Sequence, residues 1–200
     1  QYVTDEVVAA PDSSHFVFIG RSLRRLEMTG GSPVLGPEIR VKLAHNEELA
    51  SYDLRAFQGG YDGKTLLTPT KIWNSTADWD GFSQAFLTTI DTTTGETRHL
   101  SKMEDTSWDE APEIEVRGDR AWYSFTDATP SSFEAPRLEL ASRYAEEVPE
   151  VVLPRAAPMK VSADGSALLA WYGRGDILGV GLYTVPSDGS AAPQLVRAVD

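Results

Sequence analysis

The chain has 200 residues, enough for one domain with a substantial buried core, and its 41% hydrophobic and 24% charged residues are ordinary for a globular protein. Eighteen basic residues against thirty acidic ones give a net charge of −12, which repels phosphate backbones, so we expect no nucleic-acid partner. The absence of cysteine excludes disulfides and zinc–thiolate sites, and no apolar run approaches the roughly 20 residues that a membrane span needs.

Four segments of the chain share one layout, in which a tight turn is followed by an apolar strand, a loop, a second strand and a second turn. The turns are marked by Asp12, Asp62, Gly118 and Asp164, and they recur at intervals of roughly 50 residues, a period typical of propeller blades. The strands expected after them cover residues 15–19, 65–67, 120–123 and 167–172. Asp and Gly between apolar runs are strong signals for β-hairpins.

The remaining elements follow the same order in each segment. Innermost strands are expected at 111–116 and 157–161, third strands at 23–28 and 137–140, and outer strands at 96–100 and 194–196; glycine-containing second turns are expected at 29–31, 93–95 and 187–189. Residues 46–49 are compatible with one capped helical turn. Residues 140–147 have a helical composition, but their place in the repeat favours a strand and a turn.

These patterns predict an all-β chain, a β-propeller with four recognisable four-stranded blades at about 1–43, 44–102, 103–155 and 156–200. The strand at 167–172 is apolar on both faces, which a central strand needs when neighbouring blades cover it on both sides.

The fourth segment resembles a known family. Ser162-Ala163-Asp164-Gly165, the apolar strand after it and the stretch from Leu182 to Gly189 are similar to the Pro-Asp-Gly repeat of TolB-type β-propellers, with Ala163 in place of the usual proline. The resemblance implies a propeller that usually closes with six or more blades, so we expect these four blades to be part of a larger propeller, completed by another chain or by further sequence. It also implies a periplasmic or secreted location, which suits a chain without cysteine.

Long loops rich in Trp and Asp are expected at one face of such a propeller, because the loop after the second strand and the link between blades emerge there. Trp is enriched at binding hot spots, and loops on a rigid scaffold commonly carry function. The candidate binding residues are Trp73, Asp78, Trp79, Asp80, Trp108, Asp109, Glu110, Arg174 and Asp176.

Three functions remain open at this point. The first is a non-catalytic scaffold that binds a protein partner or a ligand through this loop face. The second is the substrate-gating propeller of a larger hydrolase, whether prolyl-oligopeptidase-like, tricorn-like or linked to an amidohydrolase. The third is a metal-dependent enzyme acting on carbohydrates or lactones. No catalytic residue is assigned, because the sequence has no nucleophile elbow and no zinc-protease motif.

No cofactor is expected apart from the alternative of calcium bound by Asp78, Asp80 and Asp109, which lack the distal Glu of an EF-hand loop. The three histidines, His15, His45 and His99, fall in separate segments. We expect His15 and His99 to be structural or solvated.

Overall fold

The computed structural model describes residues 6–9, 15–19, 21–49, 55–56, 64–72, 84–103, 114–125, 137–142, 144, 150–173 and 178–199. All regular structure in these residues is β-strand, so the expectation of an all-β chain is confirmed. None of the described segments forms a helix with the length and apolar character of a membrane span.

The strands form four antiparallel sheets, each built from strands that follow one another in the chain. The first sheet contains β1 (Glu6–Ala9), β2 (His15–Ile19), β3 (Ser22–Thr29) and β4 (Ser32–Arg40). The second contains β5 (Glu47–Leu49), β6 (Arg55–Ala56), β7 (Thr65–Ile72), β8 (Gln84–Asp91) and β9 (Thr97–Met103). The third contains β10 (Ile114–Arg117), β11 (Arg120–Phe125), β12 (Arg137–Ser142) and β13 (Glu150–Pro154). The fourth contains β14 (Ala156–Val161), β15 (Ala167–Tyr172), β16 (Gly181–Pro186) and β17 (Gln194–Ala198).

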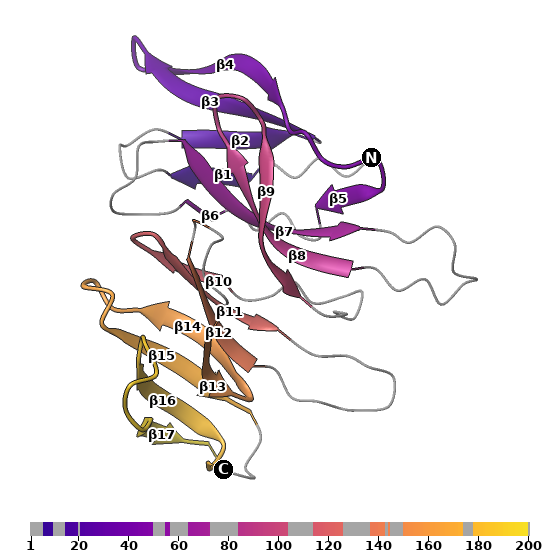
Figure 1. Ribbon diagram of the computed structural model, residues 1–200. Coiled ribbons are helices and arrows are strands. Elements are labelled where there is room, and N and C mark those ends of the chain that lie inside the picture. Colours follow the sequence, from indigo (N-terminus) through magenta and orange to yellow (C-terminus); the bar gives the residue numbers. More distant parts are fainter. Residues whose placement is uncertain are drawn as a thin grey trace.

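The sheets follow one another in space in the order of the sequence, with the first at the top of Figure 1 and the fourth at the bottom. Strands early in each sheet contact their counterparts in the next: β1 lies beside β6, β6 beside β10, and β10 beside β14. We call the face of a sheet that is turned toward the next sheet its forward face, the opposite side its backward face, and the contact between two sheets a joint.

Alternation along the second strand of a sheet sends consecutive residues into different joints, because successive strand side chains point to opposite faces. Leu66 packs with Phe16 and Leu23 in the joint between the first and second sheets. Its neighbour Leu67 packs with Ile114 and other residues of the third sheet.

The third sheet repeats this division of neighbouring residues. Tyr123 belongs to the joint with the second sheet, and Trp122 to the joint with the fourth, where it packs in a cluster with Leu168 and Tyr183. A sheet with a neighbour on each side thus has two apolar faces to bury.

The burial of β7 and β15 differs as this arrangement requires. The six central residues of β7 are all buried, because sheets lie on both sides of it. In β15 buried and half-buried residues alternate, although the strand is apolar throughout. The expectation that this strand is apolar on both faces is thus correct, while the described residues bury only its backward face fully.

The turn before the outermost strand of a sheet packs against the outermost strand of the preceding sheet. Gly95 has a φ of 71°, and a Cβ placed on it would overlap the carbonyl oxygen of Arg40 at the end of β4. Gly189 has a φ of 68° and also faces the preceding sheet, but a Cβ placed on it would make only ordinary van der Waals contact with Val152 of β13. Gly95 is therefore required by the joint as well as by the turn, whereas Gly189 is required by its turn.

Aspartate carboxylates stabilise the turns by accepting hydrogen bonds from backbone amides that follow, as in Asx-turns. Asp91 accepts from the amides of Thr93 and Thr94, both at 2.8 Å. Hydrogen bonds from the Ser162 hydroxyl and from the amide and hydroxyl of Ser166 lower the pKa of Asp164 to about 2. Asp164, the repeat aspartate among the described residues, thus has a local structural role; Asp12 and Asp62 lie outside the described residues.

Several expected strands match the structure, above all 15–19 and 167–172, which are β2 and β15. The helical turn at 46–49 was wrong: Glu47, Glu48 and Leu49 pair in register with Ile72, Lys71 and Thr70 of β7. Pairing with a neighbouring strand outweighs the local capping pattern there. The second sheet also holds one strand more than the expected four, because β6 pairs with β7 beside β5.

We predict that Gly95→Ala lowers the free energy of unfolding by about 3 kcal/mol or more, because it adds a steric overlap between two sheets to the cost of a positive φ. Gly31→Ala is the matched control: Gly31 has a φ of 82° but nothing within 4 Å of an added Cβ, so only about 1 kcal/mol should be lost. Urea denaturation measures both. Equal losses would show that the contact between Gly95 and Arg40 does not support the joint.

Candidate functional site

The residues proposed from the sequence as binding or calcium-ligating lie outside the described part of the chain. They are Trp73, Asp78, Trp79, Asp80, Trp108, Asp109, Glu110, Arg174 and Asp176. Among the residues that are described, no group of three or more His, Asp or Glu side chains is arranged to hold a metal ion.

A buried carboxylate in the second sheet, Glu47, is the clearest polar site that the described residues build. It begins β5 and is only 2% exposed. Its Oε1 lies 2.8 Å from Nε2 of His99 on β9, and its Oε2 accepts a hydrogen bond of 3.0 Å from the amide of Ala44. A residue in the link between two sheets and a residue on an outer strand therefore meet at one carboxylate.

Burial by itself raises the pKa of Glu47, because it disfavours the charged form. The hydrogen bonds from the Thr70 side chain, the Ala44 amide and His99 outweigh burial, and the pKa lies below its ordinary value of 4.5. Glu47 is therefore a carboxylate at neutral pH, and its oxygens only accept hydrogen bonds.

The imidazole of His99 is held on two sides. The carboxylate of Glu47 requires Nε2 to carry the hydrogen, and the ring of Phe86 stacks on the imidazole with centroids 4.0 Å apart and planes 14° apart. The His99 side chain is 35% exposed. These two contacts fix the orientation of the His99 imidazole and place a hydrogen on its Nε2, at the edge of the second sheet.

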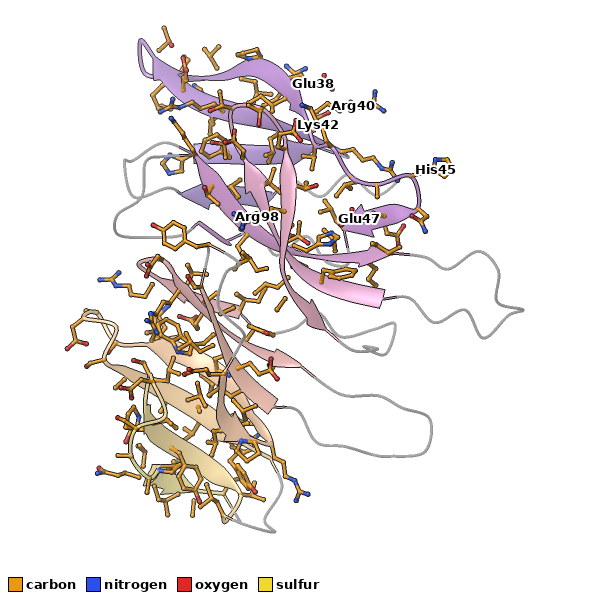
Figure 2. The ribbon with its side chains drawn as sticks, in the orientation of Figure 1. Glu38, Arg40, Lys42, His45, Glu47 and Arg98 are labelled. Atoms are coloured by element: carbon orange, nitrogen blue, oxygen red, sulfur yellow. The ribbon has the colours of Figure 1, made fainter. Side chains whose placement is uncertain are left out.

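Threonine side chains continue this polar cluster into the sheet. The hydroxyl of Thr70, which bonds to Glu47, lies 2.7 Å from that of Thr88, and both residues are fully buried. Figure 2 shows Glu47 among the strands of the second sheet, whereas His45 projects outward from the link before β5. The Glu47 cluster, made of Glu47, Thr70, Thr88 and His99, thus connects β5, β7, β8 and β9.

A second buried carboxylate, Glu139, lies in the joint between the second and third sheets. Tyr123 donates a hydrogen bond of 2.9 Å to Oε2 of Glu139, and its oxygen lies 2.8 Å from the hydroxyl of Ser101 on β9. Because the Tyr123 hydrogen is directed to the carboxylate, Ser101 is the donor of the second bond. This chain of hydrogen bonds links the second sheet to the third.

The joint between the third and fourth sheets has polar contacts as well. The indole of Trp122 donates a hydrogen bond of 2.8 Å to the carbonyl of Ser187 in the last turn. Glu115 accepts from the amide of Val161 at 3.3 Å. Arg117 donates to the carbonyl of Ala163 in the neighbouring hairpin turn. In the joint between the second and third sheets and in the joint between the third and fourth sheets, polar bonds thus accompany the apolar packing.

A carboxylate–histidine pair is the arrangement that orients a general base in many enzymes. In the Glu47 cluster the carboxylate is closed off from solvent, and its oxygens are used by an amide, a hydroxyl and an imidazole that belong to the fold. The Glu47 cluster therefore has a structural role: it holds the link 41–46 and β9 against β5 and β7.

Sequence reasoning missed Glu47 and treated His99 as structural or solvated. His99 is structural, and it is also partly exposed. The only signals for the pair are a Glu at the start of a short strand, next to a second Glu, and a His on an outer strand, and these lie 52 residues apart in the sequence. No protein-family model matches the chain, and no curated protein matches it either.

We predict that Glu47→Gln lowers the free energy of unfolding by about 1–3 kcal/mol at neutral pH, because an amide cannot accept all the hydrogen bonds that converge on the carboxylate. The folded-state pKa of Glu47 is depressed, so its contribution to stability is complete above pH 4.5 and is lost as the pH falls through the folded-state pKa. The deficit of the variant should therefore shrink on acidification in urea titrations. Glu48→Gln, at the exposed neighbour of Glu47, is the control, and a deficit independent of pH would contradict the role assigned to the Glu47 carboxylate.

Proposed function

We propose that the chain forms part of a β-propeller of the TolB type and serves as a non-catalytic scaffold that binds a protein partner or a ligand through its Trp- and Asp-rich loops. The observation that carries the proposal is the repeated neighbourhood of the strands β1, β6, β10 and β14. Adjacent innermost strands, with meandering sheets stacked face to face, are what a propeller requires.

Support for a common loop face comes from the strand ends. The hairpins of the second and third strands close with the pairs Ile72–Gln84, Phe125–Arg137 and Tyr172–Gly181. The segments 73–83, 126–136 and 173–180 therefore connect at equivalent ends of three successive sheets. Met103, the last residue of β9, pairs with Ala85 at that same end of the second sheet, where the segment 104–113 begins.

The residue types in these segments favour binding over turnover. Trp73, Trp79 and Trp108 belong to two of the segments, and buried Trp side chains contribute strongly at protein interfaces. In the described joints, by contrast, the buried carboxylates of Glu47 and Glu139 bond to groups of the fold itself. We therefore assign recognition to the loops and stability to the joints.

The absence of native cysteine allows a direct test of the loop face with paired spin labels. Labels at Asp78→Cys and Asp109→Cys, in the segments after β7 and after β9, should give a short distance by double electron–electron resonance. Labels at Asp78→Cys and Thr94→Cys should give a longer distance, because Thr94 lies in the turn at the opposite end of the second sheet. The reverse order of the two distances would contradict the common loop face.

Binding itself is tested at Trp79, which is flanked by Asp78 and Asp80. Trp79→Ala should weaken the binding of a protein partner by about 2 kcal/mol or more, as at an interface hot spot. Thr94→Ala, at the other end of the sheet, should leave the affinity unchanged. Calorimetric titration with the partner measures both, and equal affinities for wild type and Trp79→Ala would exclude Trp79 as an anchor.

A further inference from the structure

The forward face of the fourth sheet is apolar and only half-buried. Strand register places Trp171 opposite Ala157 on one side and Leu182 on the other, and Leu169 lies two residues before Trp171 on the same face. All four side chains are partly exposed. On the backward face of the same sheet, Leu168, Ala170 and Tyr172 are at most 1% exposed.

Equivalent positions in the preceding sheets are covered. Leu67 and Trp122 lie on the forward faces of the second and third sheets, and they are at most 2% exposed because the next sheet packs on them. Leu169 has the corresponding place in β15, the third residue of its strand as Leu67 is of β7 and Trp122 of β11. The fourth sheet therefore carries a surface of the kind that forms a joint.

The first sheet carries an exposed apolar surface at the other end of the molecule. The β3–β4 hairpin projects as an arm at the top of Figure 1. Its register pairs Leu26 with Leu35 and Met28 with Pro33 on one face. Met28 is 69% exposed and Leu35 44% exposed. Leu23 packs toward the second sheet and therefore lies on the forward face of the first sheet. Because successive side chains on a strand point to opposite faces, Arg25 shares this forward face and Leu26 lies on the backward face. The apolar face of the arm thus continues the backward face of the first sheet.

We propose that the forward face of the fourth sheet binds the backward face and the hairpin arm of the first sheet of a second copy of this chain. Every joint within the chain joins a forward face to a backward face, and this contact would form one more joint of that kind. The two exposed surfaces belong to the first and the fourth sheet and lie at opposite ends of the structure in Figure 1, so each copy can present one of them to the other surface of its partner.

The charged residues on the backward face of the first sheet are compatible with such a contact. Arg24 and Glu38 form an ion pair of 3.1 Å, and the Ser22 hydroxyl donates to Glu38 at 2.6 Å. Covering Arg24 and Glu38 therefore buries a formed ion pair and not two lone ions, while Arg40, opposite Ser22 on the same face, is exposed and can stay at the rim of the contact. The apolar contribution comes from Trp171, Leu182 and Met28.

A contact between two different surfaces is heterologous, and it forms a closed assembly only if the rotation between copies completes a ring. Two copies joined forward to backward at both ends would close a ring of eight sheets. The inference rests on the proposed propeller arrangement. The two proposals can fail independently, because the spin-label distances within one chain test the propeller arrangement and do not depend on whether two chains associate.

The test is the mass of the 200-residue chain in solution by light scattering, over a wide range of concentration. We expect a dimer, twice the 21.9 kDa of one chain. Trp171→Asp and Met28→Asp should each raise the dissociation constant at least about 30-fold, since each places a charge in the contact. Val151→Asp is the matched control, because Val151 is 50% exposed on an outer strand away from both surfaces, and it should leave the dimer intact. Urea denaturation verifies that each variant is folded, and Leu182→Asp replaces Trp171→Asp if that variant is not.

Mixing the two variants distinguishes the head-to-tail contact from a symmetric one. The Met28→Asp chain retains an intact fourth sheet, and the Trp171→Asp chain retains an intact arm, so an equimolar mixture should form a heterodimer through one restored joint. A monomeric wild-type chain would overturn the proposal, as would a dimer that survives both substitutions or a mixture that stays monomeric.

Discussion

The structure depends on the packing of one sheet face against the next. A four-stranded sheet with apolar residues on both faces is not stable alone in water, because both apolar faces stay exposed. Leu66 and Leu67 illustrate the solution, since neighbours in the chain are buried in two different joints. Strand pairing builds each sheet, and the joints give the sheets their order in space.

Polar groups help to select one arrangement of the sheets. Apolar contacts alone tolerate sliding of one sheet over another, whereas hydrogen bonds to buried groups require a defined register. Tyr123 with Ser101 and Trp122 with the Ser187 carbonyl connect one sheet to the next. Glu47 with His99 connects the first and last strands of the second sheet, 52 residues apart in the sequence. Gly95 adds a steric requirement, because only a residue without a side chain fits against Arg40 there.

Local signals were sufficient to predict much of the fold. The sequence was enough to identify the apolar strands β2 and β15 and the turns at Gly30, Gly95 and Gly189. Buried strands require apolar residues, and turns with positive φ favour glycine, so both can be recognised from residue type alone. The pair Glu47–His99 could not be predicted, because it arises when distant residues are brought together by the sheet. The helical reading of 46–49 failed for the same reason: β7 is the partner that makes this segment a strand. The Trp- and Asp-rich loops lie outside the described residues, so their assignment stays a prediction.

Residue-resolved amide hydrogen exchange tests most directly the claim that burial on two faces sets the stability of a sheet. We expect the amides of β7, which is covered on both sides, to exchange only through global unfolding. The amides of β16 and β17 should exchange faster in dilute solution, because none of the described sheets covers the forward face of the fourth sheet and every residue of β17 is exposed. If the fourth sheet exchanged as slowly as β7 in a monomeric chain, the packing of sheet on sheet would not be the interaction that holds this structure together.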